Sequence, residues 1–88
     1  RTVEVIHFGE WNHEAGPDFK RALVRFSDGA ECEGDIELDP DIRDWEAHGH
    51  AQNPAYAGVV LQLFLTAPGP VLYARTVDHR AVAQARLE

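Results

Sequence analysis

Two acidic motifs on either side of a predicted β-hairpin are the residues of this chain best suited to chemistry. Asp18 follows Pro17 at the start of one strand, and Glu37 lies on the next strand between Asp35 and Asp39. Carboxylates on adjacent strands can converge on one point, and oxygen ligands are those that Mg²⁺ and Mn²⁺ prefer. We therefore expect Asp18, Asp35 and Glu37 to bind Mg²⁺ or Mn²⁺. Such an ion would lower the pKa of a bound water and stabilise charge on a phosphodiester.

The histidines provide a second set of candidates. His13 lies in a polar loop, and His48 and His50 flank Gly49 at the end of a predicted helix. Because imidazole titrates near neutral pH, these side chains suit the positioning of water and proton transfer. The predicted catalytic residues are His13, Asp39, His48 and His50. A separate hypothesis places His13, His48 and His50 around Zn²⁺ or Ni²⁺, since a histidine pair alone is not a complete site.

A noncatalytic interpretation fits the same residues. An alternating acidic strand face is usually solvated, Asp39 can serve as a helix N-cap, and Asp18 can organise a turn. The chain would then be a structural or protein-interaction module, in which the acidic face meets a basic partner or the rest of the full-length protein. Both an enzyme and such a module are compatible with the sequence.

Composition limits the possible partners. The chain has 88 residues and a net charge of −7, which disfavours direct contact with bare nucleic acid unless a bound metal mediates it. No apolar run is long enough to span a membrane. The single cysteine, Cys32, excludes an internal disulfide and fits a cytoplasmic location. Because the chain starts at Arg1 without methionine, we expect residues 1–88 to be one domain excerpted from a longer protein, with a homodimer through an exposed sheet edge as one option.

The hydrophobic pattern predicts an α+β fold. We expect an antiparallel three-stranded meander, then a helix that begins with Asp39 as N-cap and Pro40 in its first turn and ends at Gly49. One or two further strands and a terminal helix over 78–86 complete this single small domain. The strands are predicted over residues 2–8, 19–26, 30–39, 59–66 and 71–77.

The third predicted strand has the clearest alternation. One face is apolar and the other carries five acids. Like charges on one strand face repel each other, and Arg21 and Arg25 on the preceding strand can compensate some of these negative charges. The apolar face is formed by Ala30, Cys32, Gly34, Ile36 and Leu38.

Several motifs together resemble a bacterial family known as domain of unknown function 2851. They are Gly9-Glu10-Trp11-Asn12-His13-Glu14-Ala15-Gly16-Pro17-Asp18-Phe19, Gly34-Asp35-Ile36-Glu37-Leu38, Asp44-Trp45, His48-Gly49-His50 and Pro54-Ala55-Tyr56. The resemblance covers roughly residues 3–66. It implies an excerpt from near the N-terminus of a longer protein, and it implies no activity.

Two positions depart from the family pattern. The pattern has histidine where this chain has Asp39, and again where it has Gln62 in the late apolar strand. If those histidines serve the family's function, the departures alter or abolish it in this chain.

A more distant similarity concerns mechanism. Pro17-Asp18, eighteen intervening residues and Glu37-Leu38-Asp39 are similar to the PD-(D/E)xK nuclease signature. That resemblance implies a metal ion held by Asp18 and Glu37 from two strands of a hairpin. The signature's lysine is replaced by Asp39, which departs from the pattern.

Overall fold

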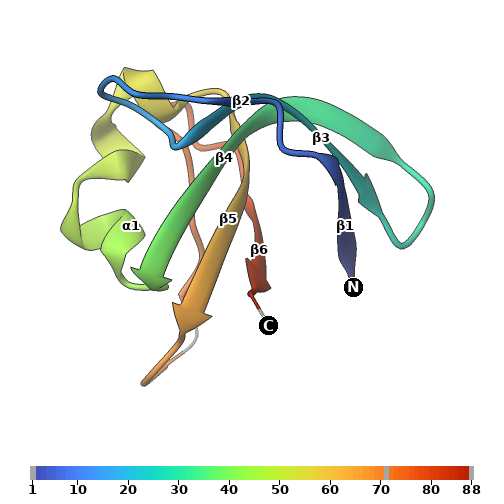
Figure 1. Cartoon of the computed structure of the whole chain (residues 1–88). Coiled ribbons are helices and arrows are strands. Elements are labelled where there is room, and N and C mark those ends of the chain that lie inside the picture. Colours follow the sequence, from blue (N-terminus) through green and yellow to red (C-terminus); the bar gives the residue numbers. More distant parts are fainter. Residues whose placement is uncertain (1, 71, 88) are drawn as a thin grey trace.

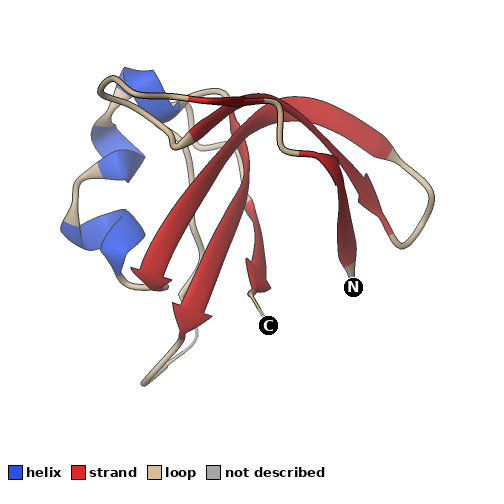
Figure 2. Cartoon of the chain, viewed as in Figure 1, coloured by secondary structure: helices blue, strands red, loops and turns tan. Residues whose placement is uncertain are grey.

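β-Structure dominates residues 2–70 and 72–87, which the computed structural model describes (Figures 1 and 2). Helical structure is confined to α1 (Asp44–Ala47) and two 3₁₀ turns, η1 (His50–Gln52) and η2 (Pro54–Tyr56). Within the described ranges, no helix has the length and apolar character needed to cross a membrane. The strands are β1 (Val3–His7), β2 (Glu10–Trp11), β3 (Phe19–Phe26), β4 (Glu31–Asp41), β5 (Val59–Thr66) and β6 (Ala83–Arg86).

These strands form one mixed sheet that curls into a half-barrel (Figure 1). The strand order is β1-β3-β4-β5-β6, and β2 also pairs with β3. The pairs β1/β3 and β3/β4 are antiparallel, whereas β4/β5 and β5/β6 are parallel. The predicted α+β fold class is therefore wrong: the fold is mostly β, with one short α-helix among the described residues.

The predicted helix start at Asp39 and Pro40 is also wrong, because β4 continues through both residues to Asp41. Asp39 pairs with Phe64 and Asp41 with Thr66 on β5, so parallel sheet pairing overrides the local capping signal. Proline is tolerated there because β3 pairs with β4 only as far as Ile36, which leaves that edge of β4 open. The helix is thereby reduced to the four residues of α1.

The C-terminal region differs from the prediction as well. The terminal helix expected over 78–86 is wrong, because residues 83–86 form β6 and pair with β5. Of the strand predicted over 71–77, residue 71 lies outside the described residues, and 72–77 contribute only an isolated bridge between Arg75 and Ala81. The other predicted strands and the hairpin turn at residues 27–29 are confirmed within a few residues.

The two faces of the sheet bury different sets of side chains. On one face, a core cluster contains Ala22, Val24, Ile36, Leu61 and Leu63. Because Ile36 points into that cluster, strand alternation directs Glu37 and Asp39 to the opposite face. The crossover segment, residues 42–58, joins the parallel strands β4 and β5, and its helical turns lie beside the sheet (Figure 2). The two acids are consequently buried rather than solvated, with 6% and 4% of their surface exposed.

The crossover segment is anchored by its own core cluster. Trp45 is 1% exposed, and its indole Nε1 donates a hydrogen bond to the backbone oxygen of Arg75 at 3.0 Å. Tyr56 packs against Trp45 edge-on, with ring centroids 6.0 Å apart. Val59, Ala74 and Val82 complete this cluster. The packing fixes the segment that carries His48 and His50.

Close packing between β4 and β5 requires glycine at position 34. A Cβ atom there would lie 2.4 Å from Val60 Cγ1 and 2.9 Å from the Gly58 oxygen. We expect Gly34→Ala to lower the free energy of unfolding by about 1–3 kcal/mol, because the strands must separate. Urea unfolding measures this, and the exposed neighbour Glu33→Ala should stay within about 0.5 kcal/mol of wild type. Equal stability of Gly34→Ala and wild type would contradict the proposed close packing.

Candidate metal centre

Three side chains from separate segments converge on the buried face of the sheet. Each of Asp39, His48 and His50 offers one ligand atom, and these atoms all lie within 4.8 Å of one another. Asp39 comes from β4, His48 follows α1, and His50 begins η1. Asp39 and His50 are buried, whereas His48 is exposed. The group is therefore enclosed by protein on the sheet side and open to solvent beside His48.

A left-handed turn brings the two histidines together. Gly49 has φ +73°, a conformation that glycine adopts without the steric cost of a Cβ atom. The turn separates α1 from η1 and places the rings of His48 and His50 edge-to-face, with centroids 5.6 Å apart. The predicted end of the helix is confirmed, because α1 stops at Ala47 and the left-handed residue Gly49 follows its C-cap, His48.

His50 is held in place by rings but not by hydrogen bonds. Its ring stacks on Tyr56 at a centroid distance of 3.8 Å and meets the edge of Trp45 at 5.3 Å. Among the described residues, neither ring nitrogen has a hydrogen-bond partner, although the side chain is buried. A buried polar group without a partner costs about 1–3 kcal/mol, so a ligand for these nitrogens would be stabilising.

Glu37 lies directly against His50. Its Oε2 atom is 3.1 Å from His50 Nε2, whereas its Oε1 atom is buried with no hydrogen-bond partner in the described part of the chain. Burial is the main cause that raises the pKa of Glu37 to about 9, and the charges of Asp39 and Asp18 add to it. Burial also lowers the pKa of His50. Despite an ion-pair distance, the two groups therefore meet as neutral side chains at pH 7.

Asp39 is fixed from the opposite side by Gln62. The Nε2 group of Gln62 donates a hydrogen bond to Asp39 Oδ2 at 2.8 Å. Burial raises the pKa of Asp39, and the hydrogen bond from Gln62 opposes that shift. Sequence reasoning did not assign Gln62 to the site. Two signals were available: its departure from the resembled family pattern, and its position as the one polar side chain within the apolar run of residues 59–65.

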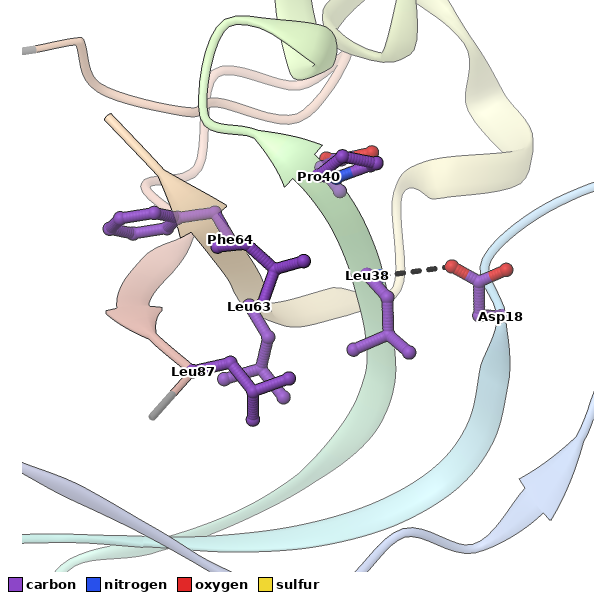
Figure 3. Close-up of a pocket in the computed structure, with 8 residues that line it drawn as sticks. Asp18, Leu38, Pro40, Leu63, Phe64 and Leu87 are labelled. Atoms are coloured by element: carbon purple, nitrogen blue, oxygen red, sulfur yellow. Dashed lines mark hydrogen bonds between the residues drawn. The ribbon is translucent and has the colours of Figure 1, made fainter. Parts of the chain in front are cut away.

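Asp18 directly precedes β3, at the point where the pairing of β3 with β4 ends. Its Oδ2 atom accepts a hydrogen bond from the Leu38 backbone N–H at 2.9 Å (Figure 3). An adjacent pocket of about 250 Å³ opens at the carboxyl ends of β4 and β5. Asp18 and Asp39 are among the residues that border this pocket. Its apolar wall is formed by Leu38, Pro40, Leu63, Phe64, Leu65 and Leu87.

The predicted site residues separate into two groups. Asp39, His48 and His50 come together, and the charges of Asp18 and Asp39 both act on Glu37. Asp35 instead lies 3.8 Å from Lys20 Nζ and is not part of the three-residue group. His13 is exposed, with its ring 6.1 Å from that of Trp11, and is not part of the three-residue group.

The electrostatics predict how stability depends on pH when metal is removed with a chelator. Between pH 4.5 and 9 the folded state retains a proton on Glu37 that the unfolded state has lost, so stability falls as pH rises. Below pH 6.5 the lowered pKa of His50 has the opposite effect. We therefore expect the free energy of unfolding to decline from pH 6.5 to 9, by on the order of 1 kcal/mol per pH unit at most.

Glu37→Gln tests this assignment, because the amide cannot ionise. Urea unfolding across this pH range should give a flatter profile for the variant and higher stability than wild type at pH 8.5. An identical slope in the two proteins would show that Glu37 is not the titrating group. Glu33→Gln, at an exposed position on the same strand, is the matched control and should leave the slope unchanged.

Comparison with known proteins identifies the family but not an activity. The family described as "Protein of unknown function (DUF2851)" matches residues 1–85. No curated protein and no solved structure matches the chain. The predicted family resemblance is confirmed, whereas the nuclease similarity is not shown by any of these comparisons. With the match extending over nearly the whole sequence, the chain belongs to the DUF2851 family.

Proposed function

We propose that this domain is a divalent-metal-dependent phosphodiesterase whose ion is held by Asp39, His48 and His50. The observation that carries the proposal is the convergence of these three ligands around a buried imidazole whose nitrogens lack hydrogen-bond partners in the described structure. Two imidazoles and one carboxylate leave further positions for water and substrate. That arrangement is typical of catalytic rather than closed structural metal sites.

The donor set favours particular ions. Imidazole suits Zn²⁺, Fe²⁺ and Ni²⁺, whereas Mn²⁺ and above all Mg²⁺ prefer oxygen ligands. We therefore expect binding in the order Zn²⁺ over Mn²⁺ over Mg²⁺. This ordering narrows the sequence-based expectation of Mg²⁺ or Mn²⁺ towards ions that accept nitrogen ligands.

The neighbouring carboxylates supply the remaining functions. A bound ion would lower the pKa of a water and stabilise negative charge on a phosphodiester. Glu37 contacts His50, and Asp18 lies beside Glu37 at the edge of the pocket. We propose that Glu37, neutral at pH 7 in the metal-free protein, helps to orient the attacking water and that Asp18 accepts its proton. Because the chain has a net charge of −7, attraction of the substrate phosphate depends on the ion.

Calorimetric titration with Zn²⁺ and Mn²⁺ tests the metal site. The His48→Ala, His50→Ala double variant should lose at least about 100-fold in affinity, because two of three ligands are removed. His7→Ala and His13→Ala, at exposed histidines outside the group, should bind as wild type does. Unchanged binding by the folded double variant would contradict the assigned ligands.

An Asp18→Asn, Glu37→Gln double variant separates binding from catalysis. We expect it to retain Zn²⁺ but to lose hydrolysis of a chromogenic phosphodiester by at least about 100-fold, since general acid–base groups contribute that much or more. Loss of binding in this variant, with retention in the histidine variant, would move the ion to Asp18 and Glu37. Equal hydrolysis by the variant and wild type would remove both acids from the mechanism.

A second candidate function is a noncatalytic structural or interaction module. The observation in its favour is that the ligands connect β4 to the crossover segment, so that an ion would fasten this segment to the sheet. In that case Zn²⁺ should raise the unfolding temperature of the wild-type chain without any phosphodiester hydrolysis. Such a module would meet the rest of the full-length protein or a separate partner.

A further inference from the structure

Gln62 is a fully buried amide at the centre of β5, between Leu61 and Leu63. It makes three hydrogen bonds. Its Nε2 group donates to Asp39 Oδ2 at 2.8 Å and to the Ile42 backbone oxygen at 3.2 Å. Its Oε1 atom accepts a hydrogen bond at 2.8 Å from Nε2 of Gln84 on β6. A buried amide is costly, and here each of its groups is used.

These partners define which way the amide points. Asp39 Oδ2 and the Ile42 carbonyl are both acceptors, so only the NH₂ end of Gln62 can face them. The donor from Gln84 requires an acceptor on the other side. Rotation of the amide by 180° would place oxygen against oxygen and nitrogen against nitrogen. The orientation of Gln62 is therefore fixed, and with it the direction from which Asp39 is held.

We propose that Gln62 is a positioning residue for the metal centre. Its hydrogen bond occupies Oδ2 of Asp39 and leaves Oδ1 as the single oxygen offered to the ion. This inference rests on the proposed metal site. Gln84 acts through Gln62, because its hydrogen bond fixes the amide rather than the carboxylate. A carboxylate that binds through one oxygen favours a small four-coordinate ion such as Zn²⁺ over ions that need more ligands.

Gln62→Met tests the role of the amide, because methionine is unbranched and of similar length but has no N–H donor. On the chain of residues 1–88, we expect about 10–100-fold weaker Zn²⁺ binding by calorimetry, as for other groups that orient metal ligands. We also expect a changed visible absorption spectrum of the Co²⁺-substituted protein, because Asp39 can then offer both oxygens. A purely structural role would lower thermal stability but leave the Co²⁺ spectrum unchanged.

Gln84→Met is the second variant and keeps the test decisive if Gln62→Met does not fold. Gln84 is only partly buried, so this change removes the bond to Gln62 at lower cost to the core. We expect a smaller loss of Zn²⁺ affinity, of a few-fold, and a Co²⁺ spectrum shifted in the same direction.

Each outcome has a defined meaning. Wild-type affinity and an unchanged Co²⁺ spectrum in the folded variants would overturn the positioning role while leaving the metal centre intact. Absence of Zn²⁺ and Co²⁺ binding by the wild-type chain would overturn the proposed function and this inference together. Weaker binding with an altered spectrum would support the role of Gln62.

Discussion

Burial of two carboxylates on the central strand is the constraint on which the rest of this structure depends. Glu37 and Asp39 lie on β4, which pairs with a neighbour on each side, and the crossover segment lies on the face to which they point. Moving an ionised carboxylate out of water costs several kcal/mol after relaxation. The surrounding groups are those that reduce this cost: the Gln62 amide donates to Asp39, and the His50 imidazole contacts Glu37.

Protonation and cation binding are two ways to reduce the free-energy cost of burying these carboxylates. A proton on Glu37 removes one charge, in accordance with its raised pKa. It does not provide a partner for both buried nitrogens of His50. A divalent ion would compensate the carboxylates and also accept an imidazole nitrogen. A buried imidazole without a hydrogen bond in the described part of the chain therefore favours the proposed ligand site over two acids that simply share a proton.

Local pattern predicted the hairpin and the strand alternation, because both depend on neighbouring residues. The Ser27-Asp28-Gly29 turn sets the antiparallel pairing of β3 and β4, which brings Asp18 near Glu37. The noncatalytic interpretation takes the acidic face to be solvated, because alternation cannot show what covers a face. What covers the acidic face depends on the parallel pairing of β4 with β5. These two strands are separated in sequence by the crossover segment, so neighbouring residues do not reveal the pairing. The same pairing continued β4 through Asp39-Pro40, where local capping rules predict a helix.

The long-range pairing also connects the two departures from the family pattern. Positions 39 and 62 are 23 residues apart in sequence, but the Gln62 amide donates directly to the Asp39 carboxylate. Because the two side chains share one hydrogen bond, a substitution at either position changes the environment of the other. Asp39 offers an oxygen to the proposed ion, and Gln62 offers an N–H donor to Asp39. In the proposed metal centre the two positions therefore act together, because Gln62 holds the carboxylate that Asp39 would offer to the ion.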